Sequence, residues 1–284
     1  MADKDKDELS GVETTGHEWD GLKELNTPLP RWWLYVFYAT VLWAIGYWII
    51  YPAWPFLNGY TKGVIGYSSR GELTETMARV EKGRSTWKGR FEAASVSDII
   101  KDAELFTYAQ AGGRAIFADN CAPCHAAGGS GSTGYPSLAD DDWIWGGDVE
   151  SIYTTVRFGA RGIHEETRVG DMPAFGTDEI LNQKQITAVS DYVLSLSSGP
   201  KAGEGKRIFA EQCASCHGEA GTGNKELGAP NLADAIWLYG SSAKDIMTQI
   251  SRPKHGVMPS WEGRLDSVSL KQVSIYVHAL GGGQ

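Results

Sequence analysis

The chain has 284 residues, more than one ordinary domain needs, so about two domains are expected. Its formal net charge is −9 and no stripe of Lys and Arg runs along it, which argues against a nucleic-acid-binding protein. The acidic segment 140–166 either steers a basic partner by long-range attraction or simply keeps a domain soluble, and the sequence leaves both interpretations open.

The N-terminal part predicts a tail and one membrane anchor. Residues 1–30 are polar and acidic without apolar periodicity, which favours a mobile tail. Residues 31–55 contain an uncharged run, WWLYVFYATVLWAIGYWIIY, whose length matches the ~30 Å hydrocarbon layer of a bilayer. Aromatic residues at both ends suit the membrane interfaces, and Pro52 and Pro55 end the helix. A signal peptide would need a basic start, and a buried core helix is usually shorter and amphipathic, so we expect a transmembrane helix.

The remainder of the chain divides into a connector and two copies of one sequence pattern. Residues 56–107 predict a helical connector, with breaks at its glycines Gly71, Gly83 and Gly89. GRAIFADNCAPCH (113–125) matches GKRIFAEQCASCH (205–217), and PSLADDDWIWG (136–146) matches PNLADAIWLYG (230–240). Such a duplication predicts two similar domains, residues 108–198 and 199–284, both all-α because neither copy carries a hairpin signal.

Each copy contains a Cys-x-x-Cys-His motif, which is the attachment pattern of a c-type haem. On a helix, positions i, i+3 and i+4 share one face, so two thiols and one imidazole are presented together. A structural zinc site would need a second ligand pair in each half, and a redox-active disulfide usually sits in a βαβ unit. Two covalently bound haem c groups are therefore predicted, attached through Cys121 and Cys124 and through Cys213 and Cys216.

The iron ligands follow from the same motifs and from two later Met-Pro pairs. His125 and His217 are predicted to bind iron from one side, and Met172 and Met258 from the other. Methionine more often fills a core, and we assign that role to Met247. His164 and His255 are rival ligands because each precedes a Met-Pro pair, but their offsets are not equivalent and we expect both at the surface or in loops. His17 and His278 have no partner signal.

An iron with both axial positions filled transfers single electrons and has no place for oxygen or peroxide. Five aromatic residues are predicted to wall the haem pockets and exclude water: Trp143, Trp145, Trp237, Phe117 and Phe209. Arg157 and Arg161 either pair with haem propionates or are solvated, and the sequence does not decide between these roles.

The anchor carries a resemblance to a known family. DGLKELNTPLPRWWLYVFYATVLWAIGYWIIYP (20–52) resembles the N-terminal segment of CcoP/FixP, the dihaem subunit III of cbb3-type cytochrome c oxidases, in which Asn-x-Pro-Leu-Pro-x-Trp-Trp opens an aromatic span. The similarity continues through both haem motifs and covers nearly the whole chain. It implies an all-α fold with one N-terminal transmembrane helix followed by two tandem class I cytochrome c domains.

The resemblance also implies a role and a location. The chain would accept electrons from a donor c-type cytochrome and pass them to a haem–copper catalytic subunit, beside a monohaem cytochrome c subunit of the same proton-translocating oxidase. It would not itself reduce oxygen. Because bacteria attach haem covalently outside the inner membrane, the tail is expected in the cytoplasm and the haem domains in the periplasm.

Three other functions fit the haem motifs. The chain could serve as the dihaem electron-transfer subunit of another respiratory complex or dehydrogenase, which would lack the family's anchor. A dihaem peroxidase would need one displaceable iron ligand. In a third alternative, one haem domain serves only as a scaffold.

Overall fold

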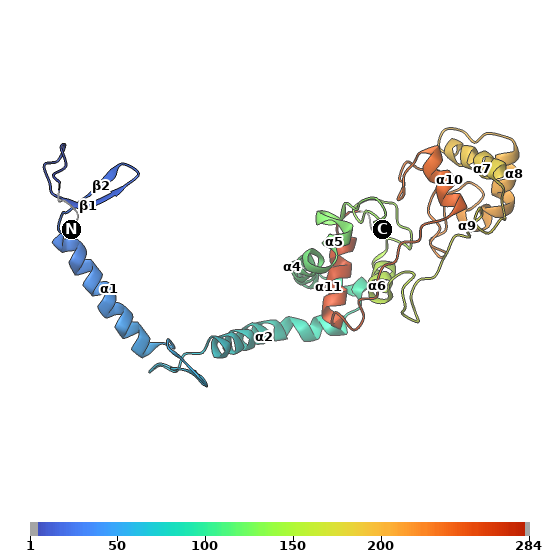
Figure 1. Cartoon of the computed structure of the whole chain (residues 1–284). Helices are drawn as coiled ribbons and strands as arrows, with labels where there is room; N and C mark the ends of the chain where they lie inside the picture. The colour runs from blue at the N-terminus through green and yellow to red at the C-terminus, as the bar shows by residue number, and fades with distance from the viewer. Residues whose placement is uncertain (1–4, 282–284) are drawn as a thin grey trace. The chain divides into compact units, whose positions relative to one another are not determined.

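The computed structural model describes residues 5–281 and divides into two compact units, Met1–Gly83 and Arg84–Gln284. The regular structure of the described residues is almost entirely helical, as predicted (Figure 1). The first unit holds the membrane-helix candidate, and the second holds both Cys-x-x-Cys-His motifs.

The first unit begins with a hairpin where the sequence predicts a mobile tail. Strands β1 (Thr14–Trp19) and β2 (Leu22–Leu25) pair antiparallel, with Trp19 opposite Leu22. The two residues between them, Asp20 and Gly21, both have positive φ, at 47° and 85°. Asp-Gly is the preferred pair for a two-residue hairpin turn of this handedness, because that turn needs the left-handed region at both positions. The turn explains the hairpin, which the lack of apolar periodicity did not reveal.

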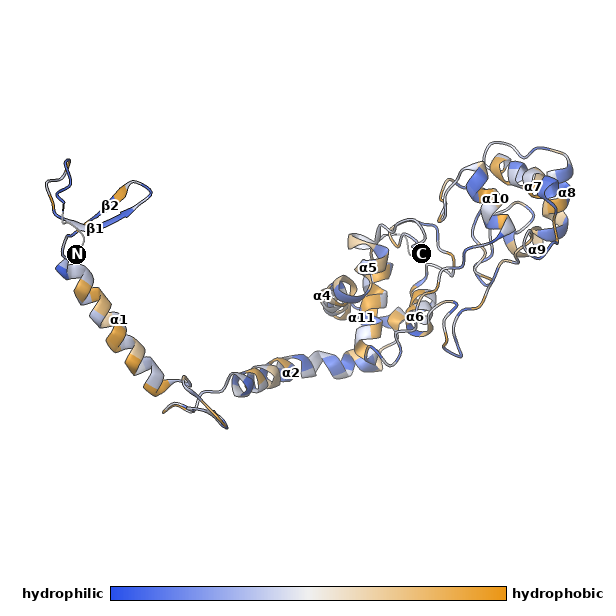
Figure 2. Ribbon diagram, viewed as in Figure 1, coloured by the Kyte–Doolittle hydropathy of each residue, from blue (hydrophilic) through white to orange (hydrophobic). Residues whose placement is uncertain are grey.

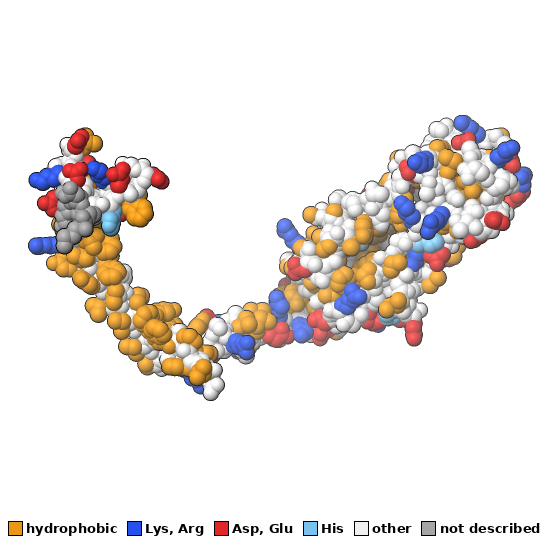
Figure 3. Space-filling view, viewed as in Figure 1, with side chains coloured by type: hydrophobic (Ala, Val, Ile, Leu, Met, Phe, Trp, Pro, Cys, Tyr) orange, Lys and Arg blue, Asp and Glu red, His pale blue; other side chains and the backbone are white. Residues whose placement is uncertain are grey.

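Helix α1 (Arg31–Ile50) has the length and composition of a membrane span. It starts after Pro30 and ends where Tyr51 turns extended ahead of Pro52. Its mean hydropathy is 1.6, and the structure buries none of its side chains. Hydrophobic side chains cover it on the face shown (Figure 3), and beyond its first residue it carries no charged residue (Figure 2). A helix that is apolar all round is stable only in an apolar environment, so this helix is a candidate transmembrane anchor.

A second small hairpin and a long helix follow. Strands β3 (Pro55–Phe56) and β4 (Gly59–Tyr60) pair antiparallel. Helix α2 (Ser69–Ala93) then runs without interruption through Gly71, Gly83 and Gly89. The predicted breaks are therefore wrong, because a glycine costs a helix only about 1 kcal/mol relative to alanine and does not block its hydrogen bonds.

The second unit contains two helical bundles. The first, here called the α4 bundle, packs α3 (Val96–Ile99), α4 (Ala103–Asn120), α6 (Val149–Phe158) and α11 (Ser267–His278) around two clusters of buried side chains. The second, the α8 bundle, packs α7 (Gln183–Ser195), α8 (Glu204–Gln212) and α10 (Ala243–Ser251) around one cluster. The short helices α5 (Ala122–His125) and α9 (Ala214–His217) carry the haem motifs, and the 3₁₀ turn η1 (Ala127–Gly129) follows α5.

The two sequence repeats exchange their last helices. Helix α11 ends the second repeat but packs on α4 and α6 of the first, while α7 ends the first repeat and packs on α8 and α10 of the second. Figure 1 shows the red α11 among the green helices of the α4 bundle. The predicted boundary between residues 198 and 199 therefore separates the two sequence repeats. It does not separate the two bundles, because each bundle contains helices from both repeats.

Equivalent glycines make both helix crossings possible. Gly113 in α4 and Gly205 in α8 occupy the same position of the repeated motif. A Cβ on Gly113 would overlap the carbonyl oxygen of Gln272 in α11, and one on Gly205 would overlap that of Ala188 in α7. Each backbone therefore approaches its partner helix more closely than any side chain allows.

Replacing Gly113 tests the first crossing. Gly113→Ala is expected to destabilise the holoprotein by about 1–3 kcal/mol, because the added methyl group must separate two packed helices. Thermal unfolding followed by circular dichroism measures this loss. Gly89→Ala is the matched control, since a Cβ there has nothing within 4 Å, and it should be neutral or slightly stabilising. An unchanged melting temperature for Gly113→Ala would contradict the crossing of α4 by α11.

Candidate haem-binding site

The first Cys-x-x-Cys-His motif is held in one geometry by the turn after it. Cys121 caps α4 and starts α5, which ends at His125. The Nδ1 atom of His125 lies 3.0 Å from the carbonyl oxygen of Pro136. A carbonyl oxygen can only accept, so Nδ1 carries the proton and Nε2 keeps its lone pair for a metal. Burial lowers the pKa of His125, which favours the neutral imidazole that a metal ligand requires.

The second motif repeats this arrangement. The Nδ1 atom of His217 lies 2.9 Å from the carbonyl oxygen of Pro230, and the side chain is buried. Burial lowers the pKa of His217 as well. In both copies, the loop after the motif folds back on the histidine, because the amides of Gly131 and Gly223 donate to the carbonyl oxygens of His125 and His217 at 2.8 Å. The two motifs thus present equivalent free Nε2 atoms.

The four cysteines form no disulfide within the part of the chain that the structure describes. Cys121 and Cys213 are half-buried, and burial raises the pKa of each thiol to about 11. Cys124 and Cys216 are exposed. Reactive or redox-active thiols usually have a lowered pKa, so the Cys121 and Cys213 environments do not suit a thiolate nucleophile.

One cavity of about 1020 Å³ contains both motifs. This volume lies at the upper end of ligand-binding pockets, which measure about 300–1,000 Å³. Its walls come from both repeats and include all eight residues predicted to bind haem: Cys121, Cys124, His125, Met172, Cys213, Cys216, His217 and Met258. The structure therefore gathers the predicted residues around a single space.

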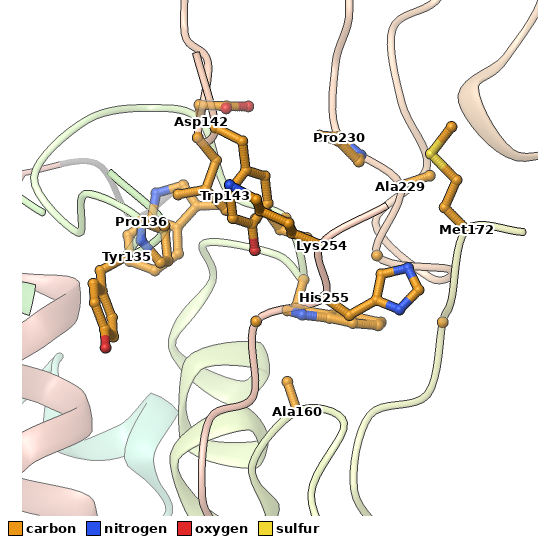
Figure 4. A pocket seen from close by; sticks show the side chains of 18 of the residues that line it. Tyr135, Pro136, Asp142, Trp143, Ala160, Met172, Ala229, Pro230, Lys254 and His255 are labelled. Carbon is orange, nitrogen blue, oxygen red and sulfur yellow. The ribbon is translucent and has the colours of Figure 1, made fainter. Parts of the chain in front are cut away.

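Each of the two predicted methionine ligands packs in the bundle that holds the other repeat's Cys-x-x-Cys-His motif. Met258, from the second repeat, packs with Cys121 against the core of the α4 bundle. Met172, from the first repeat, packs with Cys213 against the core of the α8 bundle. In Figure 4, Met172 lies on the side of Ala229 and Pro230, away from Tyr135 and Pro136. Each bundle thus combines a histidine from one repeat with a methionine from the other.

Backbone contacts between the repeats hold these methionine loops in place. Ala160 and Met258 exchange two hydrogen bonds, with N–O distances of 3.0 and 2.9 Å. After Met172, the amides of Gly176 and Thr177 donate to the carbonyl oxygen of Ser251 at 3.2 and 3.1 Å. The exchange therefore involves the ligand loops as well as the final helices.

Most of the predicted wall residues lie at the cavity. Trp143, Trp145, Trp237 and Phe209 line it. Phe117 is buried one layer behind, where its ring lies 5.4 Å from that of Tyr276. These aromatic side chains contribute to the largely apolar wall of the cavity.

The structure separates the two arginines that the sequence left undecided. Arg161 lines the cavity, whereas Arg157 pairs with Glu262 at 2.6 Å. His164 also binds Glu262, at 3.0 Å, away from the cavity lining. His255 lies in an exposed loop, as expected, and also lines the cavity, 3.5 Å from Asp171. Its place at the cavity could not be inferred from the sequence, because Asp171 belongs to the other repeat.

The chain's own residues fit a covalently attached haem. In each motif, two cysteine thiols lie one helical turn apart, and the histidine that follows them has a free Nε2. A methionine thioether packs in the same bundle. The cavity walls are mostly apolar and aromatic. This donor set matches c-type haem ligation.

Three family models match successive parts of the chain. The N-terminal domain of cytochrome oxidase-cbb3, FixP, matches residues 11–58. Cytochrome c matches residues 110–197, and cytochrome C oxidase, cbb3-type, subunit III, matches residues 200–277.

Curated relatives match along the full length. A cbb3-type cytochrome c oxidase subunit FixP of Bradyrhizobium diazoefficiens is 52% identical over 98% of both chains. A subunit of the same name from Rhizobium meliloti is 49% identical over 100% of both chains. A cbb3-type cytochrome c oxidase subunit CcoP of Cereibacter sphaeroides is 46% identical over 95% of both chains.

Asp142, which lines the cavity (Figure 4), gives a pH-dependent prediction. Burial, with repulsion from Asp234 and Asp140, raises the pKa of Asp142 to about 6. Because the folded state disfavours the charged carboxylate, stability is lost as pH rises from about 4 through 6. Asp142→Asn should therefore melt at a higher temperature than the wild type at pH 8, and the difference should vanish near pH 4.

Thermal unfolding of the holoprotein across this pH range measures the effect. Asp191→Asn, which removes an exposed carboxylate on α7, is the matched control and should show no such pH dependence. Equal melting temperatures for Asp142→Asn and wild type at pH 8 would contradict the burial of a charge at this position.

Proposed function

The chain belongs to the FixP/CcoP family of cbb3-type cytochrome c oxidase subunits, and from this premise we propose that it is a membrane-anchored dihaem cytochrome that relays electrons to the catalytic subunits of such an oxidase. Its cytochrome c domains imply covalently bound haem c. The observation that carries the proposal is the shared cavity, in which two histidines with free Nε2 atoms face two methionine-bearing loops.

Two haem c groups are proposed, one in each bundle. In the α4 bundle, Cys121 and Cys124 would hold the haem, with His125 and Met258 as axial ligands. In the α8 bundle the corresponding residues are Cys213 and Cys216 for attachment, and His217 and Met172 as ligands. The packing of Met258 with Cys121 and of Met172 with Cys213 supports this crossed pairing.

The bound haem supplies an iron that gains and loses one electron at a time. The chain's contribution is to hold that iron in a fixed and dry environment. The Pro136 and Pro230 carbonyl groups orient the histidine rings. As ligands, the methionine thioethers would favour reduced iron and so raise its potential. With both axial positions filled, this chain alone is not expected to reduce oxygen.

The proposed setting is a bacterial inner membrane. Helix α1 would cross it once, with the N-terminus in the cytoplasm and the haem-binding unit in the periplasm. The partners would be a haem–copper catalytic subunit and a monohaem cytochrome c subunit of a proton-translocating oxidase, with a donor c-type cytochrome supplying electrons. The apolar surface of α1 and the subunit names of the relatives support this assignment.

Counting haem groups tests the site directly. The wild-type chain should carry two covalent haem groups by intact mass, and the Cys121→Ala/Cys124→Ala variant should carry one. Ser215→Ala, which changes only a residue between the second pair of cysteines, is the control and should retain both. A wild-type mass with fewer than two haem groups would contradict the dihaem assignment.

Purification of the intact complex tests the physiological role. Affinity purification of the tagged full-length chain from mildly solubilised membranes should recover a haem–copper subunit and a monohaem cytochrome c, identified by mass spectrometry. The same procedure on untagged membranes is the control. Recovery of a dehydrogenase or quinol-oxidising complex without a haem–copper subunit would contradict the oxidase assignment and support the alternative electron-transfer role.

A further inference from the structure

The short segment at the end of α6 touches both methionine-bearing loops. Gly159 ends α6 with φ +75°, and a Cβ there would overlap the carbonyl oxygen of Met258. Ala160 is buried and exchanges two backbone hydrogen bonds with Met258. Residues of the first repeat thus fix the backbone that carries the second repeat's methionine.

The side chain of the next residue, Arg161, reaches both loops. Its Nε donates to the carbonyl oxygen of Gly170 at 2.7 Å, and its Nη1 donates to that of Gly256 at 3.4 Å. Gly170 lies two residues before Met172, and Gly256 lies two residues before Met258. The planar guanidinium group can serve both carbonyl groups because it holds its donors in a fixed fork.

Surrounding contacts fix the position of Arg161. Its side chain is 19% exposed and lies 3.3 Å from the carboxylate of Asp171. The guanidinium carbon lies 5.3 Å from the centre of the Trp145 ring, within the range of a cation–π interaction. Arg161 therefore has partners in both Met loops and in the aromatic wall of the cavity.

The backbone of Arg161 is strained. Its φ is +55°, a left-handed conformation that is uncommon for a residue with a long side chain. The strain persists because the Arg161 amide donates to the carbonyl oxygen of Arg168 at 2.8 Å, closing the loop between them. Strained residues that the surrounding structure holds in place concentrate at functional sites.

We propose that Arg161 is a positioning residue for both axial methionines, so that one guanidinium group couples the ligation of the two haem groups. The proposal rests on the proposed function, in that Met172 and Met258 must be iron ligands. The coupling is mechanical. A shift of the guanidinium group displaces the backbone two residues before each sulfur, and each haem's potential then depends on the same side chain.

The test compares Arg161→Gln with the wild-type holoprotein. Two signals are measured: the near-infrared absorption band of the bond between methionine sulfur and ferric iron, and both haem potentials by spectroelectrochemical titration. Arg161→Gln should weaken the band and lower both potentials. A change at one haem only, or at neither, would overturn the proposal while leaving the proposed function intact.

Arg161→Lys separates anchoring from charge. Lysine keeps the positive charge beside Asp171 but lacks the fixed fork, so this variant should also weaken the band and lower both potentials. Wild-type behaviour of Arg161→Lys would show that the charge alone is sufficient, and lowered potentials with an unchanged band would show that the sulfur–iron bonds do not depend on Arg161. Either result would overturn the positioning role. Lysine also keeps a cation in the cavity wall, which protects the test if Arg161→Gln fails to fold.

Two glycines provide a matched pair of controls. A Cβ in Gly159→Ala would press on the backbone of Met258, Pro259 and Ser260 and not on the Met172 loop, so only one potential should fall. At Gly162, a Cβ would meet the Met258 carbonyl oxygen at an ordinary 3.5 Å, so Gly162→Ala should change neither. If Gly159→Ala lowered both potentials equally, the coupling would not be specific to the Arg161 side chain, and the proposal would fail.

Discussion

The close crossing of α4 by α11, and of α8 by α7, is the contact on which the rest of the second unit depends. At each crossing a glycine lets the two helix backbones approach closely. The two helices of each crossing belong to different repeats. Helices α7 and α11 directly follow the loops that carry Met172 and Met258. When each helix packs in the bundle of the other repeat, its methionine loop therefore lies in that bundle as well. The Ala160–Met258 and Gly176–Ser251 hydrogen bonds then fix the crossed loops.

This exchange makes the two proposed haem sites interdependent. Neither repeat contains, in its own bundle, both its Cys-x-x-Cys-His motif and the methionine of its Met-Pro pair. The two motifs also share one cavity, whose walls come from both repeats. We therefore expect a change in one repeat to affect the ligand environment of the other, which separate domains joined by a flexible linker would not do. For an electron relay, such an arrangement places both sites at one cavity with largely apolar walls.

Much of the site followed from the sequence. The cysteine and histidine positions depend on local helical spacing, so Cys121, Cys124 and His125 could be placed together without any tertiary information. The uncharged run also predicted helix α1 with little error at its ends, since Pro30 and Pro52 bound it.

The features that the sequence did not reveal depend on contacts between distant residues. Two similar repeats give the same local signals whether their last helices stay or exchange, so the partner of Met258 could not be inferred from its own repeat. Arg161 and His255 contact residues of the other repeat, about 90 positions away. The N-terminal hairpin was missed for a different reason, because its signal lies in the Asp20-Gly21 turn and not in an apolar pattern.

In the proposed arrangement, each haem takes its histidine from one repeat and its methionine from the other. A variant in which Cys213 and Cys216 are replaced by alanine, leaving one haem on Cys121 and Cys124, tests this crossed pairing. Adding Met258→Leu should abolish the near-infrared band of the sulfur–iron bond, and adding Met172→Leu should leave it. Loss of the band with Met172→Leu and its retention with Met258→Leu would contradict the crossed pairing.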